Sequence, residues 1–137
     1  MSARIPTLAL VEDIGAANVG ILADIYHFWD LPGIEDDLLA SGDHLVGVQL
    51  SDFRKPTRGP MDRVLPGDGV IDTRAIFRVL DRAGFQGWYD IEVFSDNGLF
   101  GDTYPDSLWD EDPRELAKRA VRQVRDLWDT RSDGEAV

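Results

Sequence analysis

Acidic, amide and imidazole side chains accompany the three most apolar short runs of the sequence. Asp24 and His27 follow the run VGILA, and Gln49 lies near the end of HLVGVQL. Glu92 lies in a third run, GWYDIEVF. Two carboxylates, an amide oxygen and an imidazole form a donor set that suits a hard divalent cation such as Mn²⁺ or Mg²⁺. A divalent-metal site is therefore the first chemistry that these residues indicate.

Each of these residues also has a structural explanation. Asp24 is equally explained as a helix N-cap or as an acid in a surface turn, and His27 as a half-buried packed imidazole. Gln49 lies within an apolar run, so its amide needs hydrogen-bond partners wherever it is buried. Glu92 differs from the others, because burying an unpaired carboxylate is costly and a cation or a base must face it.

A long loop over residues 51–69 adds basic residues to the candidates. Its segment PTRGPMDRVLPGDG lacks the Gly-Lys-Ser/Thr ending of a phosphate-binding P-loop. Arg63 is nevertheless a candidate for holding a substrate oxyanion or phosphate, whereas Arg58 is expected to be solvated. Asp52 and Asp90 are expected to be capping or surface acids.

Strands and helices that alternate along the chain must position these side chains. The apolar runs 19–23, 44–50 and 87–94 predict strands, and because polar residues do not alternate in them, we expect both of their faces to be buried. Amphipathic patterns predict helices over 6–15, 34–41, 72–83 and 113–128. The polar segment 129–137 is expected to be a disordered tail.

This order of elements predicts the α/β class. Strands that alternate with helices form parallel sheets through right-handed crossovers, and 137 residues suit one domain. In such sheets chemistry gathers at the carboxyl ends of the strands, where this chain also has its long loops. A complete flavodoxin-like domain is a weaker interpretation, because no Gly-rich or Ser/Thr-rich phosphate loop follows the first strand.

The composition excludes several classes of partner. The net charge is −12, from 26 acidic and 14 basic residues, so we expect neither nucleic acid nor an anionic membrane to bind. The chain has no cysteine, hence no disulfide and no thiolate metal site. No apolar run long enough for a transmembrane helix and no secretory signal are seen, which predicts a cytoplasmic protein.

Five segments in order resemble the sugar phosphate isomerase/epimerase family of xylose-isomerase-like TIM barrels. They are DIYH, VQLSD, DRVLPGDGVID, AGFQGWYDIEVF and YPDSLW, and the similarity spans roughly residues 7–128. A TIM barrel has about 250 residues. The resemblance therefore implies a partial (β/α)₈ barrel, in which residues 1–137 are the C-terminal portion with about the last three βα units.

The resemblance also implies roles for five residues. Asp24, Gln49 and Glu92 would hold the divalent metal, Glu92 would also be a catalytic acid/base, and His27 and Arg63 would bind substrate. Gln49 replaces the family's usual histidine, although dehydroshikimate-dehydratase-like lyases use glutamine there. The family's first metal glutamate, which is also its second acid/base group, has no counterpart in this chain.

The function implied is a divalent-metal-dependent sugar (phosphate) isomerase or epimerase. It would transfer a proton next to the carbonyl of a sugar or keto-polyol through a metal-stabilised enediolate. One alternative is a dehydratase-like lyase. The other is a non-catalytic partial barrel that forms a homo-oligomer or pairs with a separate N-terminal fragment, because its outer strands leave open sheet edges.

Overall fold

The computed structural model describes residues 6–133, in which helices and strands alternate as the sequence predicts. The helices are α1 (Pro6–Ile14), α2 (Ile34–Ser41), α3 (Thr73–Arg82) and α4 (Pro113–Asp129). The strands are β1 (Ile21–Asp24), β2 (Leu45–Leu50), β3 (Asp52–Phe53), β4 (Arg63–Val64) and β5 (Trp88–Ile91). Short 3₁₀ turns occupy Ile25–His27, Gly42–His44 and Leu108–Asp110.

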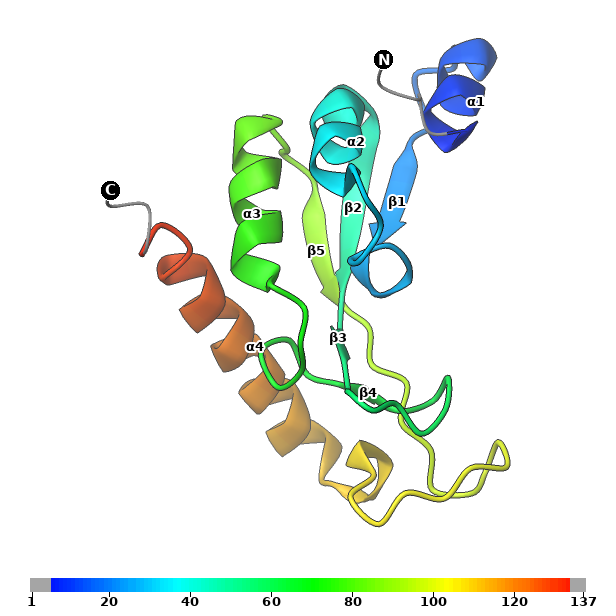
Figure 1. Ribbon diagram of the computed structural model, residues 1–137, viewed down its shortest axis with the longest axis vertical. Helices are drawn as coiled ribbons and strands as arrows, with labels where there is room; N and C mark the ends of the chain where they lie inside the picture. The colour runs from blue at the N-terminus through cyan, green and yellow to red at the C-terminus, as the bar shows by residue number, and fades with distance from the viewer. Residues whose placement is uncertain (1–5, 134–137) are drawn as a thin grey trace.

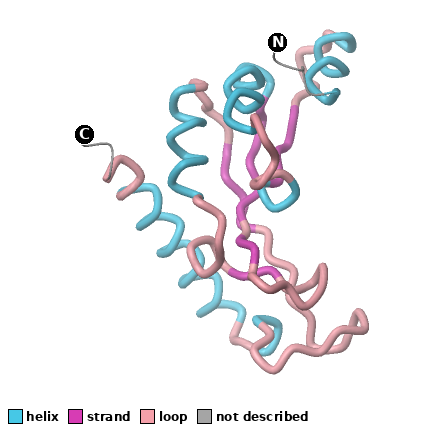
Figure 2. Tube along the Cα trace, in the orientation of Figure 1, coloured by secondary structure: helices cyan, strands magenta, loops and turns pink. Residues whose placement is uncertain are grey.

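The main sheet has the strand order β1-β2-β5, and both pairs are parallel. Its register aligns Asp24 with Gln49 and Gln49 with Asp90. Figure 1 shows the three strands running in the same direction, and in Figures 1 and 2 the long loops gather beyond their carboxyl ends. The predicted α/β class with parallel strands is therefore confirmed.

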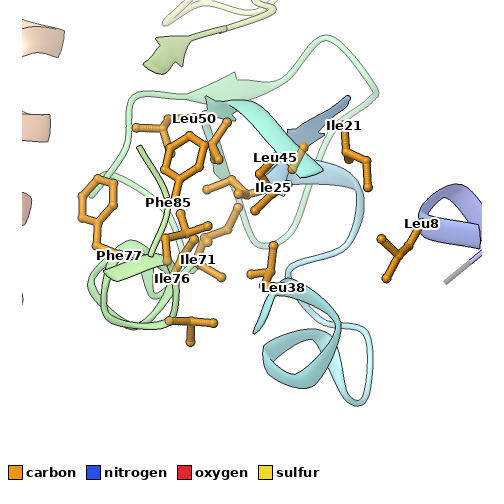
Figure 3. Close-up of a cluster of buried hydrophobic side chains, with 14 of the residues drawn as sticks. Leu8, Ile21, Ile25, Leu38, Leu45, Leu50, Ile71, Ile76, Phe77 and Phe85 are labelled. Carbon is orange, nitrogen blue, oxygen red and sulfur yellow. The ribbon is translucent and has the colours of Figure 1, made fainter. Parts of the chain in front are cut away.

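One face of this sheet is covered by α2 and α3, which pack beside each other (Figure 1). Val48 and Leu50 of β2 are fully buried in the core. Figure 3 shows Leu50 in the same cluster as Leu38 of α2 and Ile76 of α3. Phe77 is also fully buried. Its ring lies 5.1 Å from Tyr89 of β5 and 5.2 Å from Trp128 of α4, so this one side chain joins three elements.

The opposite face of the sheet is open. Leu22 of β1 is 50% exposed and Trp88 of β5 is 57% exposed. The expectation that these strands are buried on both faces is therefore wrong for β1 and β5. Within residues 6–133 each of these two strands pairs with β2 alone, so both edges of the main sheet are free.

The loop predicted over residues 51–69 contains the small antiparallel ribbon of β3 and β4. Asp52 organises this loop from inside: its buried carboxylate accepts hydrogen bonds from the backbone N–H groups of Phe53, Gly67 and Ile71 at 2.8–2.9 Å. Of the two roles expected for Asp52, capping acid or surface acid, the structure shows the first, because the carboxylate caps backbone N–H groups and is buried. Asp90 is exposed, as expected, and accepts a hydrogen bond from Trp88 Nε1.

The segment 129–137, expected to be disordered, is described only up to residue 133. Thr130 to Asp133 form a turn after α4. Arg131 in this turn donates to Asp81 of α3 at 2.6 Å and stacks on Trp128. Residues 134–137 lie outside the described part of the chain.

Candidate functional site

The residues predicted to do chemistry come together at the carboxyl edge of the main sheet. Asp24 is the last residue of β1, and Gln49 is the next-to-last residue of β2. Glu92 follows β5, where its backbone N–H donates to Leu50 O at 2.9 Å. Since Gln49 pairs with Asp24 and Asp90, and alternate strand residues share a face, Glu92 lies on the same face as Asp24 and Gln49.

Arg63 of β4 lies between the two carboxylates. Its Nη1 is 3.1 Å from Asp24 Oδ2 and 3.1 Å from Glu92 Oε2. The side chain is 4% exposed and its guanidinium lies over the rings of Tyr26 and Phe94, at 4.0 and 4.6 Å. Arg63 is thus the positive group that the sequence required next to Glu92.

Gln49 contacts the same glutamate. Its Nε2 donates to Glu92 Oε1 at 3.0 Å, so both oxygens of Glu92 have a partner, one from Gln49 and the other from Arg63. This is the structural hydrogen bond that the apolar surroundings of Gln49 demanded. It also places the amide beside the carboxylate that the metal hypothesis needs.

Asp24 combines the structural and the chemical roles that the sequence left open. Its Oδ1 accepts from Tyr26 N at 3.0 Å and so caps the 3₁₀ turn after β1. Its Oδ2 is 3.3 Å from His27 Nε2 and 3.1 Å from Arg63. The His27 ring is 66% exposed and 3.4 Å from the Arg63 guanidinium, so it is not the packed imidazole that was the alternative.

An apolar groove of about 420 Å³ opens beside Asp24 and His27, at the free edge of β1. Leu22, Phe28 and Leu38 are among the residues that line it. A small molecule or an ion can therefore approach Asp24 and His27 through this groove as well as from the open face of the sheet.

The donor set fits a hard divalent cation by its chemistry. Asp24, Gln49 and Glu92 supply two carboxylates and an amide, the oxygen ligands that Mg²⁺ and Mn²⁺ prefer. Among the described residues no group of three or more His, Cys, Asp and Glu side chains is arranged around one point. Residues 6–133 therefore offer a partial ligand set, with the Arg63 guanidinium between its two carboxylates.

Two aromatic residues of the site were missed by the sequence analysis. The guanidinium carbon of Arg63 lies over the rings of both Tyr26 and Phe94, and each of these residues follows a strand closely, which is the signal that could have found them. Burial raises the pKa of the Tyr26 hydroxyl, an effect that the nearby Arg63 partly offsets.

A second charged cluster ties the loop that carries Arg63 to loop 95–112. Arg54 and Arg58 both pair with Asp62 and with Asp106. Arg58 is thus not simply solvated as expected. Burial raises the pKa of Asp62, but hydrogen bonds from the Arg58 side chain and backbone outweigh it and leave that pKa below its usual value.

No helix within residues 6–133 has the length and apolar character needed to cross a membrane. The fold and the site together define a parallel βα unit with carboxylates at the carboxyl ends of its strands. The model of the xylose isomerase-like TIM barrel family matches residues 6–127. The chain belongs to this family, as the five sequence segments indicated.

Two curated relatives have different activities. An inosose dehydratase of Klebsiella pneumoniae subsp. pneumoniae is 29% identical in an alignment that covers 87% of this chain and 41% of the relative. A hydroxypyruvate isomerase of Escherichia coli K12 is 30% identical over 86 residues, 62% of this chain and 31% of the relative. This chain therefore spans at most about two fifths of the length of these relatives.

Solved structures agree with this assignment. A protein from Sinorhizobium meliloti 1021 superimposes with a TM-score of 0.74 at 28% identity, over 88% of this chain and 41% of that chain. The IOLI protein, solved with a bound zinc atom, gives a TM-score of 0.71 at 22% identity, over 93% and 44% of the two chains. The second similarity shows the fold alone.

Proposed function

We propose that this chain is the C-terminal portion of a divalent-metal-dependent enzyme that moves a proton next to the carbonyl of a sugar or keto-polyol, as an isomerase or epimerase. The observation that carries the proposal lies at the carboxyl edge of a parallel sheet, where Arg63 contacts both Asp24 and Glu92 and Gln49 is hydrogen-bonded to Glu92. Membership of the xylose isomerase-like family supports the same kind of chemistry.

In this proposal the residues of the site have three roles, which are metal binding, proton transfer and substrate binding. Asp24, Gln49 and Glu92 hold the cation, for which Mn²⁺ or Mg²⁺ suits their oxygen donors. A divalent cation there supplies positive charge that stabilises the oxygen anion formed as the proton leaves carbon. Glu92 takes or returns that proton, while His27 and Arg63 bind and orient the hydroxyl or anionic groups of the substrate.

A dehydratase is the second candidate, because an inosose dehydratase matches 87% of this chain. Both reactions begin with loss of a proton next to a carbonyl. An isomerase or epimerase then returns a proton to carbon, whereas a dehydratase expels a hydroxyl group from the neighbouring carbon. Glu92 can start either reaction, so the two candidates share the same residues and differ in the second step.

The relatives extend well beyond the part that this chain matches. We propose that further βα units complete the barrel by pairing with the free edges of β1 and β5 and by covering Leu22 and Trp88. Those units would also supply the second acid/base group. Epimerisation needs both groups, whereas exchange of one proton with solvent needs Glu92 alone.

The test is therefore a solvent-exchange assay on the purified chain. The chain is incubated with the diamagnetic ion Mg²⁺ in D₂O and a panel of ketoses, inosose and hydroxypyruvate, and the C–H signal next to the carbonyl is followed by NMR. We expect exchange with one class of substrate, its loss in Glu92→Gln, and no change in Asp90→Asn, which alters an exposed carboxylate two residues away. Ultraviolet absorbance of a conjugated enone would identify the dehydratase, and no exchange with any substrate would contradict the proposal.

A further inference from the structure

The positive charge in the described site is carried by the side chain of Arg63. Arg63 is 4% exposed and serves two carboxylates, Asp24 and Glu92, which are 13% and 31% exposed. Both carboxylates are candidates for holding the divalent metal. The positive charge of Arg63 therefore lies where a metal held by these two residues would put its own.

The hydrogen bonds of Arg63 are unevenly distributed over its guanidinium. Nη1 alone faces three acceptors, which are Asp24 Oδ2, Glu92 Oε2 and, at 3.4 Å, Ser51 Oγ. Its Nε is buried and has no hydrogen-bond partner. Strong arginine–carboxylate pairs are bidentate, with two parallel N–H···O bonds to one carboxylate. Arg63 makes no such pair with either acid. It donates one hydrogen bond to each carboxylate, which is a weaker interaction than a bidentate pair.

The rest of the side chain is held by contacts that do not involve the carboxylates. Tyr26 and Phe94 stack on the guanidinium, and the backbone N–H of Arg63 donates to Phe94 O at 3.0 Å. Nη2 lies 3.4 Å from Nε2 of the exposed His27. If the bonds from Nη1 to the acids are released, the contacts with the two rings remain and the N–H groups of the guanidinium become available to another anion.

We propose that Arg63 and a divalent cation compete for Asp24 and Glu92. Arg63 is the counter-ion of the two acids until a cation binds, and binding of the cation releases the N–H groups of Arg63 for an anionic or hydroxyl oxygen of the substrate. Metal binding therefore precedes substrate binding at Arg63. This inference rests on the proposed metal-dependent function.

Calorimetric titration of the purified chain with Mn²⁺ tests the competition directly. Arg63→Met removes the positive charge of the side chain. We expect this variant to bind Mn²⁺ at least about tenfold more tightly than the wild type, because the guanidinium no longer repels Mn²⁺ from Asp24 and Glu92. Arg54→Met is the matched control. It removes an arginine of the same loop that pairs with Asp62 and Asp106, and its Mn²⁺ affinity should equal that of the wild type.

Thermal melts of the same proteins give a second readout. Without metal, Arg63→Met should melt below the wild type, because Asp24 and Glu92 lose their counter-ion. Mn²⁺ should then raise its melting temperature by more than it raises that of the wild type. Should Arg63→Met fail to fold, Arg63→Gln takes its place: it removes the positive charge but keeps a polar amide at this position, and it should also bind Mn²⁺ more tightly than the wild type.

The outcomes separate this inference from the proposed function. Equal or weaker Mn²⁺ binding by the Arg63 variants, with clear binding by the wild type, would overturn the competition and leave the metal-dependent function standing. Absence of Mn²⁺ binding in the wild type and in every folded Arg63 variant would overturn both.

Discussion

The side-chain amide of Gln49 donates to Oε1 of Glu92 at 3.0 Å and links the carboxyl ends of the neighbouring strands β2 and β5. The hydrogen bond fixes Glu92 with its other oxygen towards Arg63. Gln49 therefore sets the geometry of the carboxylate to which we assign both metal binding and proton transfer.

Replacing Gln49 should change which metal the site prefers. Gln49→His exchanges an amide oxygen for an imidazole nitrogen, and imidazole suits Zn²⁺ whereas amide and carboxylate oxygens suit Mg²⁺ and Mn²⁺. We expect the affinity for Zn²⁺ relative to Mg²⁺ to rise about tenfold in calorimetric titrations. The control is Gln86→His, which adds an imidazole at an exposed position before β5. An unchanged ratio in Gln49→His would remove Gln49 from the ligand set.

Asp52 should be among the most important polar residues for stability. Its carboxylate is fully buried and accepts three backbone hydrogen bonds, so Asp52→Ala leaves three N–H groups without their acceptor. We expect the free energy of unfolding in urea to fall by about 3 kcal/mol. Asp68→Ala, which removes an exposed carboxylate of the same loop and its single hydrogen bond from Gln123 Nε2, should change it by about 1 kcal/mol or less. Equal effects would show that the bonds of Asp52 contribute little.

The charged cluster in which Asp62 pairs with Arg54 and Arg58 should make the stability of the fold sensitive to acid. The pKa of Asp62 in the folded chain lies below its usual value of 3.8, so its contribution to stability is complete above pH 3.8 and is lost as the pH falls through the lower folded value. Urea unfolding at pH 6 and pH 3 measures this loss. Asp62→Asn should show a smaller difference between the two pH values, whereas Asp129→Asn, at the exposed end of α4, should keep the wild-type difference.

Sequence periodicity was enough to place the elements of the fold, because each helix and strand of the main sheet has its own local pattern. The strand 44–50 and the helix 113–128 are examples that the structure reproduces to within one residue at each end. The same logic placed Asp24, Gln49 and Glu92 at one edge, since the carboxyl ends of parallel strands share an edge.

The features that the sequence did not predict depend on contacts between segments that are distant along the chain. The position of Arg63 between Asp24 and Glu92 spans 39 and 29 residues of chain, and no local pattern encodes it. Asp52 was expected to be a capping or surface acid, and its burial was missed because its three partners are backbone groups, which have no signature in the sequence. The exposed faces of β1 and β5 were missed because an apolar run shows that a strand avoids water, but not which element covers it.

The open face of the sheet leads to a prediction about association. Leu22 and Trp88 are about half exposed, and both lie over Gly47, where an added Cβ would approach Trp88 Nε1 to 2.8 Å and Leu22 Cδ1 to 2.9 Å. They therefore form one apolar area rather than two separate contacts. Exposed apolar areas next to free sheet edges promote association.

We expect the purified chain to self-associate through this area when no other βα units are present to cover it. Light scattering over a range of protein concentrations should show a mass that rises with concentration in the wild type and falls towards that of one chain in the double variant Leu22→Lys/Trp88→Lys. Phe100→Lys is the control, because Phe100 is 66% exposed but belongs to loop 95–112 and not to the sheet. If the wild type has the mass of one chain at every concentration, the open face does not attract a second copy. Association that only Phe100→Lys abolishes would instead assign the contact to the loop.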